Sequence, residues 1–177
     1  YVAVPRETAA AQRMVDIFRP IYESTDILKV GQNIKYDLNV LAHYNIHLAF
    51  PLFDTMLAHY LVQPELYHNM DFLAEVYLHY QTIHIEELIG PKGRNQKNMA
   101  DLAPADICDY ACEDADVTLR LMQPLKEELQ KFGLMQEFHD IEMPLMPVLA
   151  KMERNGVTLD TKALAETGKH FRERMHQ

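Results

Sequence analysis

Apolar residues recur at helical spacing along most of the chain, and only short runs suit strands. Residues 7–22 carry apolar side chains along one face, which predicts a helix. Residues 27–31 form a short apolar run typical of a buried strand, and residues 34–44 follow as a second helix. Residues 1–5 have the pattern of another strand. The expected order at the start is therefore strand, helix, strand, helix.

Short helices with capping residues are expected in the middle of the chain. Asp54 precedes the apolar residues 56–61, and Asp71 precedes residues 72–78. An aspartate at such a position accepts hydrogen bonds from the free amides of the first helical turn. Residues 90–97 contain glycines, a proline and three cations, which predicts a solvated surface loop, with contact to a phosphate backbone as the alternative.

One long helix is expected from Pro104 to about Phe132. Proline suits the first helical turn, and Gly133 suits the position just after a helix end. Pro124 predicts an interruption within this helix. A further helix is expected over residues 141–153. The pattern changes near residue 140, and we interpret the residues that follow as the start of a separate unit.

An acidic residue lies on the apolar face of the long helix. At about 100° per residue, Asp114 falls near the middle of the apolar stripe, and Tyr110 lies one turn earlier on the same side. A buried, unpaired carboxylate is costly, so Asp114 needs a cation, a metal or dedicated hydrogen bonds. Asp109, Glu113 and Asp116 point elsewhere, and we interpret them as solvated charges. The stripe consists of Ile107, Ala111, Val117, Thr118, Leu121, Leu125, Leu129 and Phe132.

The helix of residues 34–44 repeats this pattern. Ile34, Leu38 and Leu41 define its apolar face, and Asp37 falls on the edge of that face. For each acid alone, the simpler interpretation is a pair with a buried cation or a backbone amide. Because two acids face inward and one of them lies beside a tyrosine, a functional site is the alternative interpretation.

The acidic composition narrows the classes of function. With 17 Lys and Arg against 26 Asp and Glu, the net charge of −9 argues against a domain that holds nucleic acid over a broad basic surface. A local site of carboxylates and divalent cations is compatible with it. No apolar run is long enough to span a membrane. Two cysteines four positions apart fit neither a zinc site nor a disulfide framework, which favours a cytoplasmic protein.

Two segments resemble motifs of the DEDDy nucleases. Residues 33–37, Asn-Ile-Lys-Tyr-Asp, resemble the second exonuclease motif, and residues 110–114, Tyr-Ala-Cys-Glu-Asp, resemble the third. Together with residues 53–57 and 141–157, these blocks follow the order of family A DNA polymerases. The chain is therefore similar to the proofreading 3′→5′ exonuclease domain of that family, followed by the start of a polymerase domain.

The resemblance implies a fold and a domain division. The fold class is α/β, a ribonuclease H-like exonuclease fold in which helices dominate a short residual sheet. Residues 1–138 would form a partial exonuclease domain, and residues 139–177 the start of the polymerase domain. Residues 1–5 resemble the third strand of the fold, which indicates a boundary inside a larger protein. That larger protein would be a cytoplasmic, nucleoid-associated bacterial enzyme of DNA replication and repair.

The resemblance also implies a two-metal site for phosphodiester hydrolysis at a single-stranded 3′ end of DNA. Asp114 would bind the Mg²⁺ or Mn²⁺ ion that carries the attacking water, and Asp37 would help hold the second ion. Tyr110 would orient the attacking water through its hydroxyl.

Three further residues would contact the backbone of the terminal nucleotides by the same resemblance: Gln32, Asn33 and Tyr36. Helix capping explains Asn33 equally well, and an ordinary half-buried aromatic explains Tyr36.

The chain departs from the family in its first motif. No Asp-x-Glu sequence occurs before Asn33, so half of the acidic ligands are missing. We expect that this chain by itself does not hydrolyse DNA.

Two alternative functions remain. An exoribonuclease related to ribonuclease D would share the acids, but it would not be expected to carry residues 141–160 in polymerase-like form. A non-catalytic scaffold domain would share the fold, but the presence of Asp37, Tyr110 and Asp114 argues against it.

Overall fold

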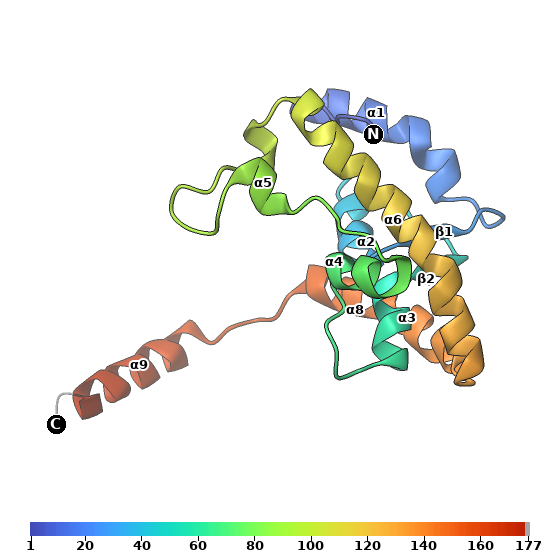
Figure 1. Ribbon diagram of the computed structural model, residues 1–177. Helices are drawn as coiled ribbons and strands as arrows, with labels where there is room; N and C mark the ends of the chain where they lie inside the picture. The colour runs from blue at the N-terminus through green and yellow to red at the C-terminus, as the bar shows by residue number, and fades with distance from the viewer. Residues whose placement is uncertain (176–177) are drawn as a thin grey trace.

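A computed structural model describes residues 1–175 of the chain (Figure 1). Helices make up most of the molecule and two short strands form its sheet, as expected from the sequence. In chain order the elements are α1 (Thr8–Tyr22), β1 (Lys29–Gly31), α2 (Ile34–Ala42), β2 (Leu52–Asp54), α3 (Thr55–Val62), α4 (Met70–Leu73), the π-helix η1 (Ala74–Leu78), α5 (Ile85–Ile89), the 3₁₀-helix η2 (Met99–Asp101), α6 (Pro104–Lys131), α7 (Met135–Glu137), the π-helix η3 (Phe138–Glu142), α8 (Met143–Asn155) and α9 (Thr161–Met175).

The sheet pairs β1 with β2 in parallel, with Val30 opposite Phe53 and Gly31 opposite Asp54. Helix α2 is the crossover between the two strands, as parallel pairing requires. Because both strands end at the same edge, the residues that open α2 and α3 meet there. The sequence did not predict β2, since its three buried residues are too few to show a strand period.

The predicted strand at residues 1–5 is wrong. This segment has no regular structure and its side chains are exposed. A strand needs a hydrogen-bonded neighbour, and in residues 1–175 the sheet consists of β1 and β2 alone.

The long helix α6 agrees with the prediction at both ends. Pro104 opens it, and Gly133, with φ of 70°, follows its end. The interruption predicted at Pro124 is wrong, because α6 continues through it while Leu121 and Leu125 on either side are fully buried. Most of the apolar stripe is confirmed, but Phe132 is 51% exposed and does not belong to the core.

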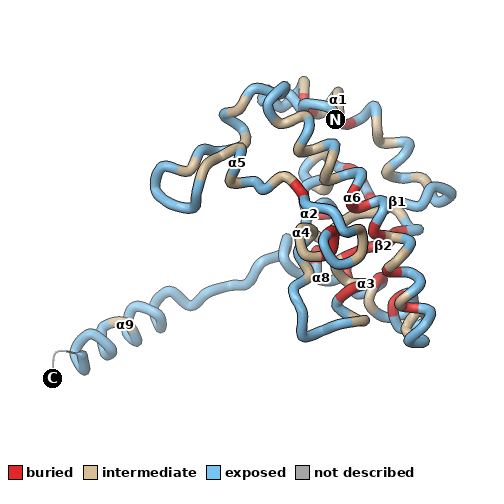
Figure 2. Tube along the Cα trace, in the orientation of Figure 1, coloured by how far each residue is buried: buried red, intermediate tan, exposed pale blue. Residues whose placement is uncertain are grey.

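The core lies between α6, α3, the sheet and α8, where the buried residues in Figure 2 gather. Phe138 of η3 is fully buried and packs against Phe53 of β2, with ring centroids 5.0 Å apart. Met143, Met146 and Ala150 of α8 belong to the same cluster. Residues 138–155 therefore share their core with the residues before them, and the domain division at 138 stays a prediction from the sequence.

Three smaller predictions need correction. Asp71 is not a cap, because α4 begins at Met70 and Asn69 occupies the N-cap position. The helix predicted over residues 34–44 ends at Ala42. The first two residues of the helix predicted over residues 141–153 belong to the π-helix η3, and α8 extends from Met143 to Asn155.

The C-terminal helix α9 projects away from the rest of the molecule and has no buried residue (Figures 1 and 2). No helix within residues 1–175 has both the length and the apolar character needed to cross a bilayer.

Candidate functional site at the end of the sheet

A single carboxylate organises the end of the sheet where α2 and α3 begin. Asp54 is 1% exposed and caps α3, as predicted, by accepting hydrogen bonds from the N–H groups of Met56 (2.9 Å) and Leu57 (3.1 Å). The same carboxylate also accepts from the N–H groups of Asn33 (3.3 Å) and Ile34 (2.6 Å), which open α2. Burial raises the pKa of Asp54, and these hydrogen bonds oppose the rise.

The side chain of Asn33 does not cap α2, so the capping interpretation is wrong. Asn33 has left-handed backbone geometry (φ 60°, ψ 52°), which asparagine tolerates better than most residues, and Asp54 takes over the capping. Gly31 permits this tight turn, because a Cβ atom there would lie 2.6 Å from the Ile34 side chain.

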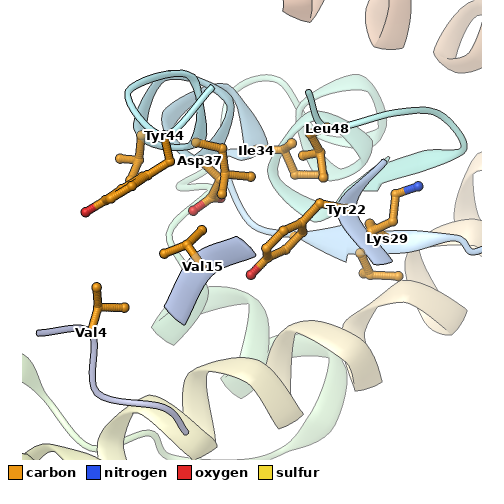
Figure 3. A pocket seen from close by; sticks show the side chains of 12 residues that line it. Val4, Val15, Tyr22, Lys29, Ile34, Asp37, Tyr44 and Leu48 are labelled. Carbon is orange, nitrogen blue, oxygen red and sulfur yellow. The ribbon is translucent and has the colours of Figure 1, made fainter. Parts of the chain in front are cut away.

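Asp37 lies in the first turn of α2 and points into a hollow of about 560 Å³ between α1, β1 and α2 (Figure 3). Val40 and Tyr44 line the same hollow, which agrees with the predicted position of Asp37 on the helix. Although the residue is open to solvent through the mouth of the hollow, many protein atoms surround its carboxyl group. Burial, reinforced by the negative charge of Asp54, raises the pKa of Asp37 to about 6.

Asp114 and Tyr110 lie together on the inner face of α6, as predicted. Asp114 is half-buried, and its Oδ1 atom has no hydrogen-bond partner among the described residues. Burial raises the pKa of Asp114 to about 6, against the lowering effect of the Tyr110 hydroxyl. Burial and the Asp114 carboxylate raise the pKa of Tyr110 to about 12, so its hydroxyl stays protonated at neutral pH.

Two further carboxylates lie near this pair. Glu113 accepts hydrogen bonds from the hydroxyl of Tyr80 (2.6 Å) and the N–H of Ile83 (2.7 Å), so its interpretation as a solvated charge is wrong. Asp71 accepts from the hydroxyl of Thr82 at 2.9 Å. Both acids contribute to the raised pKa of Asp114.

The surroundings of Asp37 and Asp114 differ. The charge that acts on Asp37 is that of Asp54, whereas Glu113 and Asp71 act on Asp114. Within residues 1–175, no group of three or more His, Cys, Asp or Glu side chains is placed to hold a metal ion. The unpartnered oxygen of Asp114 suits a hard cation such as Mg²⁺ or Mn²⁺. The acids present therefore fit part of such a site and do not complete one.

The three residues expected at the DNA backbone have different surroundings. The Gln32 amide is engaged at both ends, since its Nε2 donates to the His68 carbonyl at 2.7 Å and its Oε1 accepts from the Thr55 hydroxyl. Tyr36 is 67% exposed, so its interpretation as a half-buried aromatic is wrong. Asn33 is partly buried at the start of α2.

Sequence reasoning missed one contact of Asp54 and the position of Asp71 in this region. The capping role of Asp54 was predicted, but its bond to α2 was not, because that contact joins residues 20 positions apart. The short segment Gly31 to Asn33, with a glycine and an asparagine after a strand, was the available signal for a tight turn at this place. Nothing in the local pattern indicates that Asp71 lies close to Tyr110 and Asp114.

Known proteins resemble the chain over nearly all of its length. A family model described as 3′-5′ exonuclease, of the DNA polymerase A type, matches residues 1–130. The chain is 40% identical to DNA polymerase I of Pseudomonas aeruginosa over 99% of the chain and 19% of that protein. It is 33% identical to DNA polymerase I of Treponema pallidum over 97% of the chain and 17% of that protein. The chain thus spans about a fifth of the length of these relatives, and it belongs to the 3′-5′ exonuclease domain family of family A DNA polymerases.

Proposed function

We propose that the chain supplies part of the proofreading 3′→5′ exonuclease site of a DNA polymerase I that acts in bacterial DNA replication and repair. The proposed domain, residues 1–138, has a ribonuclease H-like fold, and residues 139–177 begin the polymerase domain of the same protein. The observation that carries the proposal is the buried, unpartnered Oδ1 of Asp114 beside Tyr110 on the inner face of α6. Membership of the exonuclease family and the names of the relatives support it.

In this proposal Asp114 and Asp37 hold Mg²⁺ or Mn²⁺ ions, which supply the positive charge that phosphodiester hydrolysis requires. Because the pKa of each acid is about 6, both are largely ionised at neutral pH and can act as ligands. The Tyr110 hydroxyl keeps its proton at this pH and orients the attacking water by a hydrogen bond.

The proposed substrate is the single-stranded 3′ end of DNA. Tyr36 is the best placed of the three candidate DNA contacts, because its ring is exposed on α2 one position before Asp37. Asn33 is the second contact. Gln32 reaches DNA only if it gives up its hydrogen bonds to His68 and Thr55, so its main contribution is to hold the end of β1 in place.

The site needs more acids than this chain provides. No Asp-x-Glu sequence precedes Asn33, and the described residues contain no cluster of three ligands. We therefore expect the chain alone, incubated with a 3′-terminal single-stranded oligonucleotide and Mg²⁺ or Mn²⁺, to leave the oligonucleotide intact. Robust, dose-dependent degradation that the Asp114→Ala substitution abolishes would contradict this expectation.

The proposed function itself is tested in a full-length polymerase that contains this chain. We expect Asp114→Ala and Asp37→Ala each to reduce 3′→5′ degradation at least 100-fold and to leave primer extension unchanged. Loss of primer extension as well would indicate a general folding defect, and unchanged degradation would contradict the proposal.

A non-catalytic scaffold is the second candidate, because residues 1–175 contain no complete set of metal ligands. The same assay separates the two, since a scaffold shows no 3′→5′ degradation even in the full-length polymerase. A ribonuclease D-like exoribonuclease is the third, and it would degrade RNA in preference to DNA. The match of the whole chain to DNA polymerase I favours a DNA substrate.

A further inference from the structure

Helix α8 contacts α2 through a group of polar side chains. The Glu153 carboxylate binds the Lys35 ammonium with one oxygen and accepts a hydrogen bond from Asn39 Nδ2, at 2.8 Å, with the other. Arg154 donates to Asn39 Oδ1 at 2.8 Å, so both ends of the Asn39 amide are engaged. We name these four residues, Lys35, Asn39, Glu153 and Arg154, the α2–α8 clasp.

The clasp holds the side of α2 that faces away from Asp37. Lys35 and Asn39 are four positions apart and share one face of the helix. Asp37 lies two positions from each, which at about 100° per residue puts it on the opposite side. Figure 3 shows that this opposite side is directed into the hollow.

The clasp restrains rotation of α2 about its own axis, which the apolar contacts of this helix restrain less well. The helix has nine residues, and only Ile34 and Leu38 are buried. Apolar burial is non-directional, so it tolerates a small rotation of the helix about its axis. Hydrogen bonds are directional: Asp54 fixes the start of α2 through the N–H groups of Asn33 and Ile34, and the three polar contacts from α8 fix the rotational setting of the turn that follows. That setting decides where the Asp37 carboxylate points.

We infer that Glu153 is a positioning residue for Asp37, which it keeps directed into the hollow through Lys35 and Asn39. The inference rests on the proposed role of Asp37 in the exonuclease site. Glu153 lies outside residues 1–130, the part that matches the exonuclease family model. Glu153 and Arg154 lie in the proposed start of the polymerase domain, yet they hold the helix that carries Asp37. A movement of α8 would therefore change the position of Asp37.

The clasp contributes to orientation more than to stability. The side chains of Lys35 and Glu153 are 35% and 49% exposed, and ion pairs at such exposure stabilise a protein little. Removing the clasp should therefore leave the chain folded while changing the surroundings of Asp37, which makes the two effects separable.

The test compares isotope-labelled chains at pH 8 by the carbon NMR signal of the Asp37 carboxylate. In Glu153→Ala and Glu153→Gln we expect this signal to shift or broaden, with a fall in Tm of no more than about 3 °C. The combined Lys35→Glu and Glu153→Lys substitutions restore the ion pair, and we expect them to return the signal toward its original position. A merely structural effect of residue 153 would not be reversed by this exchange.

The matched control is Glu128→Ala, which removes an ion pair with Lys131 on α6. It should leave the Asp37 signal unchanged. An Asp37 signal that stays unchanged in both Glu153 variants would overturn the inference. Since the measurement uses neither metal nor DNA, a failure of the proposed exonuclease function would not alter its result, and a failure here would leave that function standing.

Discussion

The Asp54 carboxylate accepts a hydrogen bond from the N–H of Ile34 at 2.6 Å, which joins the end of β2 to the start of α2. Asp54 caps α3 at the same time, so two helices that begin at one end of the sheet share a single capping residue. Asp37 follows one turn later in α2, close enough for the charge of Asp54 to raise its pKa. The geometry around Asp37 therefore depends on a buried acid that lies outside the two segments resembling the second and third exonuclease motifs.

Replacing Asp54 by alanine should destabilise the chain strongly. Four backbone N–H groups would lose their acceptor at a site that is 1% exposed. From the usual effect of losing a cap and of leaving buried amides unpaired, we expect a loss of about 3 kcal/mol in the free energy of unfolding, measured with urea.

Glu7→Ala is the matched control for Asp54. Glu7 also caps a helix through two N–H groups, those of Ala9 and Ala10, but it serves only α1 and is exposed. We expect this substitution to cost about 1 kcal/mol. Equal losses for the two variants would show that the bond from Asp54 to α2 adds nothing.

The raised pKa of Asp114 predicts a pH-dependent effect of Asp114→Asn. The folded state binds the proton of Asp114 more tightly than the unfolded state, in which the pKa of this residue is near 3.8. The protonated carboxyl group therefore contributes fully to the free energy of unfolding below pH 4, and this contribution is lost as the pH rises to about 6. Asparagine avoids the cost of the buried charge. After allowance for solvent screening at this half-buried site, we expect Asp114→Asn to raise the free energy of unfolding by about 1 kcal/mol at pH 7.5 and to leave it unchanged at pH 4.

Urea unfolding of both proteins at the two pH values measures this difference. A gain of the same size at pH 4 and pH 7.5 would show that the effect of asparagine is unrelated to ionisation of Asp114.

Glu113→Ala should loosen the segment that precedes α5. Glu113 accepts hydrogen bonds from the Ile83 N–H and the Tyr80 hydroxyl, and both would be lost. We expect the Ile83 amide to exchange its hydrogen about 10 to 100 times faster, as the loss of a hydrogen bond to a charged group implies. Asp116→Ala is the control, because the Asp116 carboxylate forms an ion pair with Arg120 on the surface of α6 and no other hydrogen bond or ion pair within residues 1–175. Hydrogen exchange that is equally fast in both variants would contradict the assigned role.

Long regular patterns in the sequence predicted the fold well. Helix α6 has 28 residues, which is enough for its period to place Asp114 and Tyr110 on the inner face. The capping of α3 by Asp54 was also visible, because capping residues act on amides two or three positions away. Pro124 was misjudged, since packing of the leucines on either side outweighs the local tendency of proline to break a helix.

Contacts between distant segments could not be predicted. The strand β2 is only three residues long, and it exists because it pairs with β1 and is covered by the core. Glu113 looked like a surface charge because its partners lie 30 or more positions earlier in the chain. The clasp joins residues more than 110 positions apart. Each of these features is set by tertiary packing, which no local pattern reports.

The core that includes η3 predicts a large effect of Phe138→Ala. Phe138 is fully buried against Phe53, although it lies beyond the residues that match the exonuclease family model. We expect a loss of about 4 kcal/mol in the free energy of unfolding. Phe132→Ala should cost less than about 1 kcal/mol, because that ring is 51% exposed. Similar losses for both would show that residues from 138 onward do not belong to the core.

The proposed function requires that Asp37 and Asp114 contribute to one divalent-metal site. This requirement is tested most directly by adding Mn²⁺ to the isotope-labelled chain and following the paramagnetic broadening of the NMR signals of residues 37 and 114. We expect both signals to broaden at the same Mn²⁺ concentration, and either Asp37→Asn or Asp114→Asn to weaken the broadening at both positions. Broadening at only one of the two acids, or at neither, would contradict the proposal.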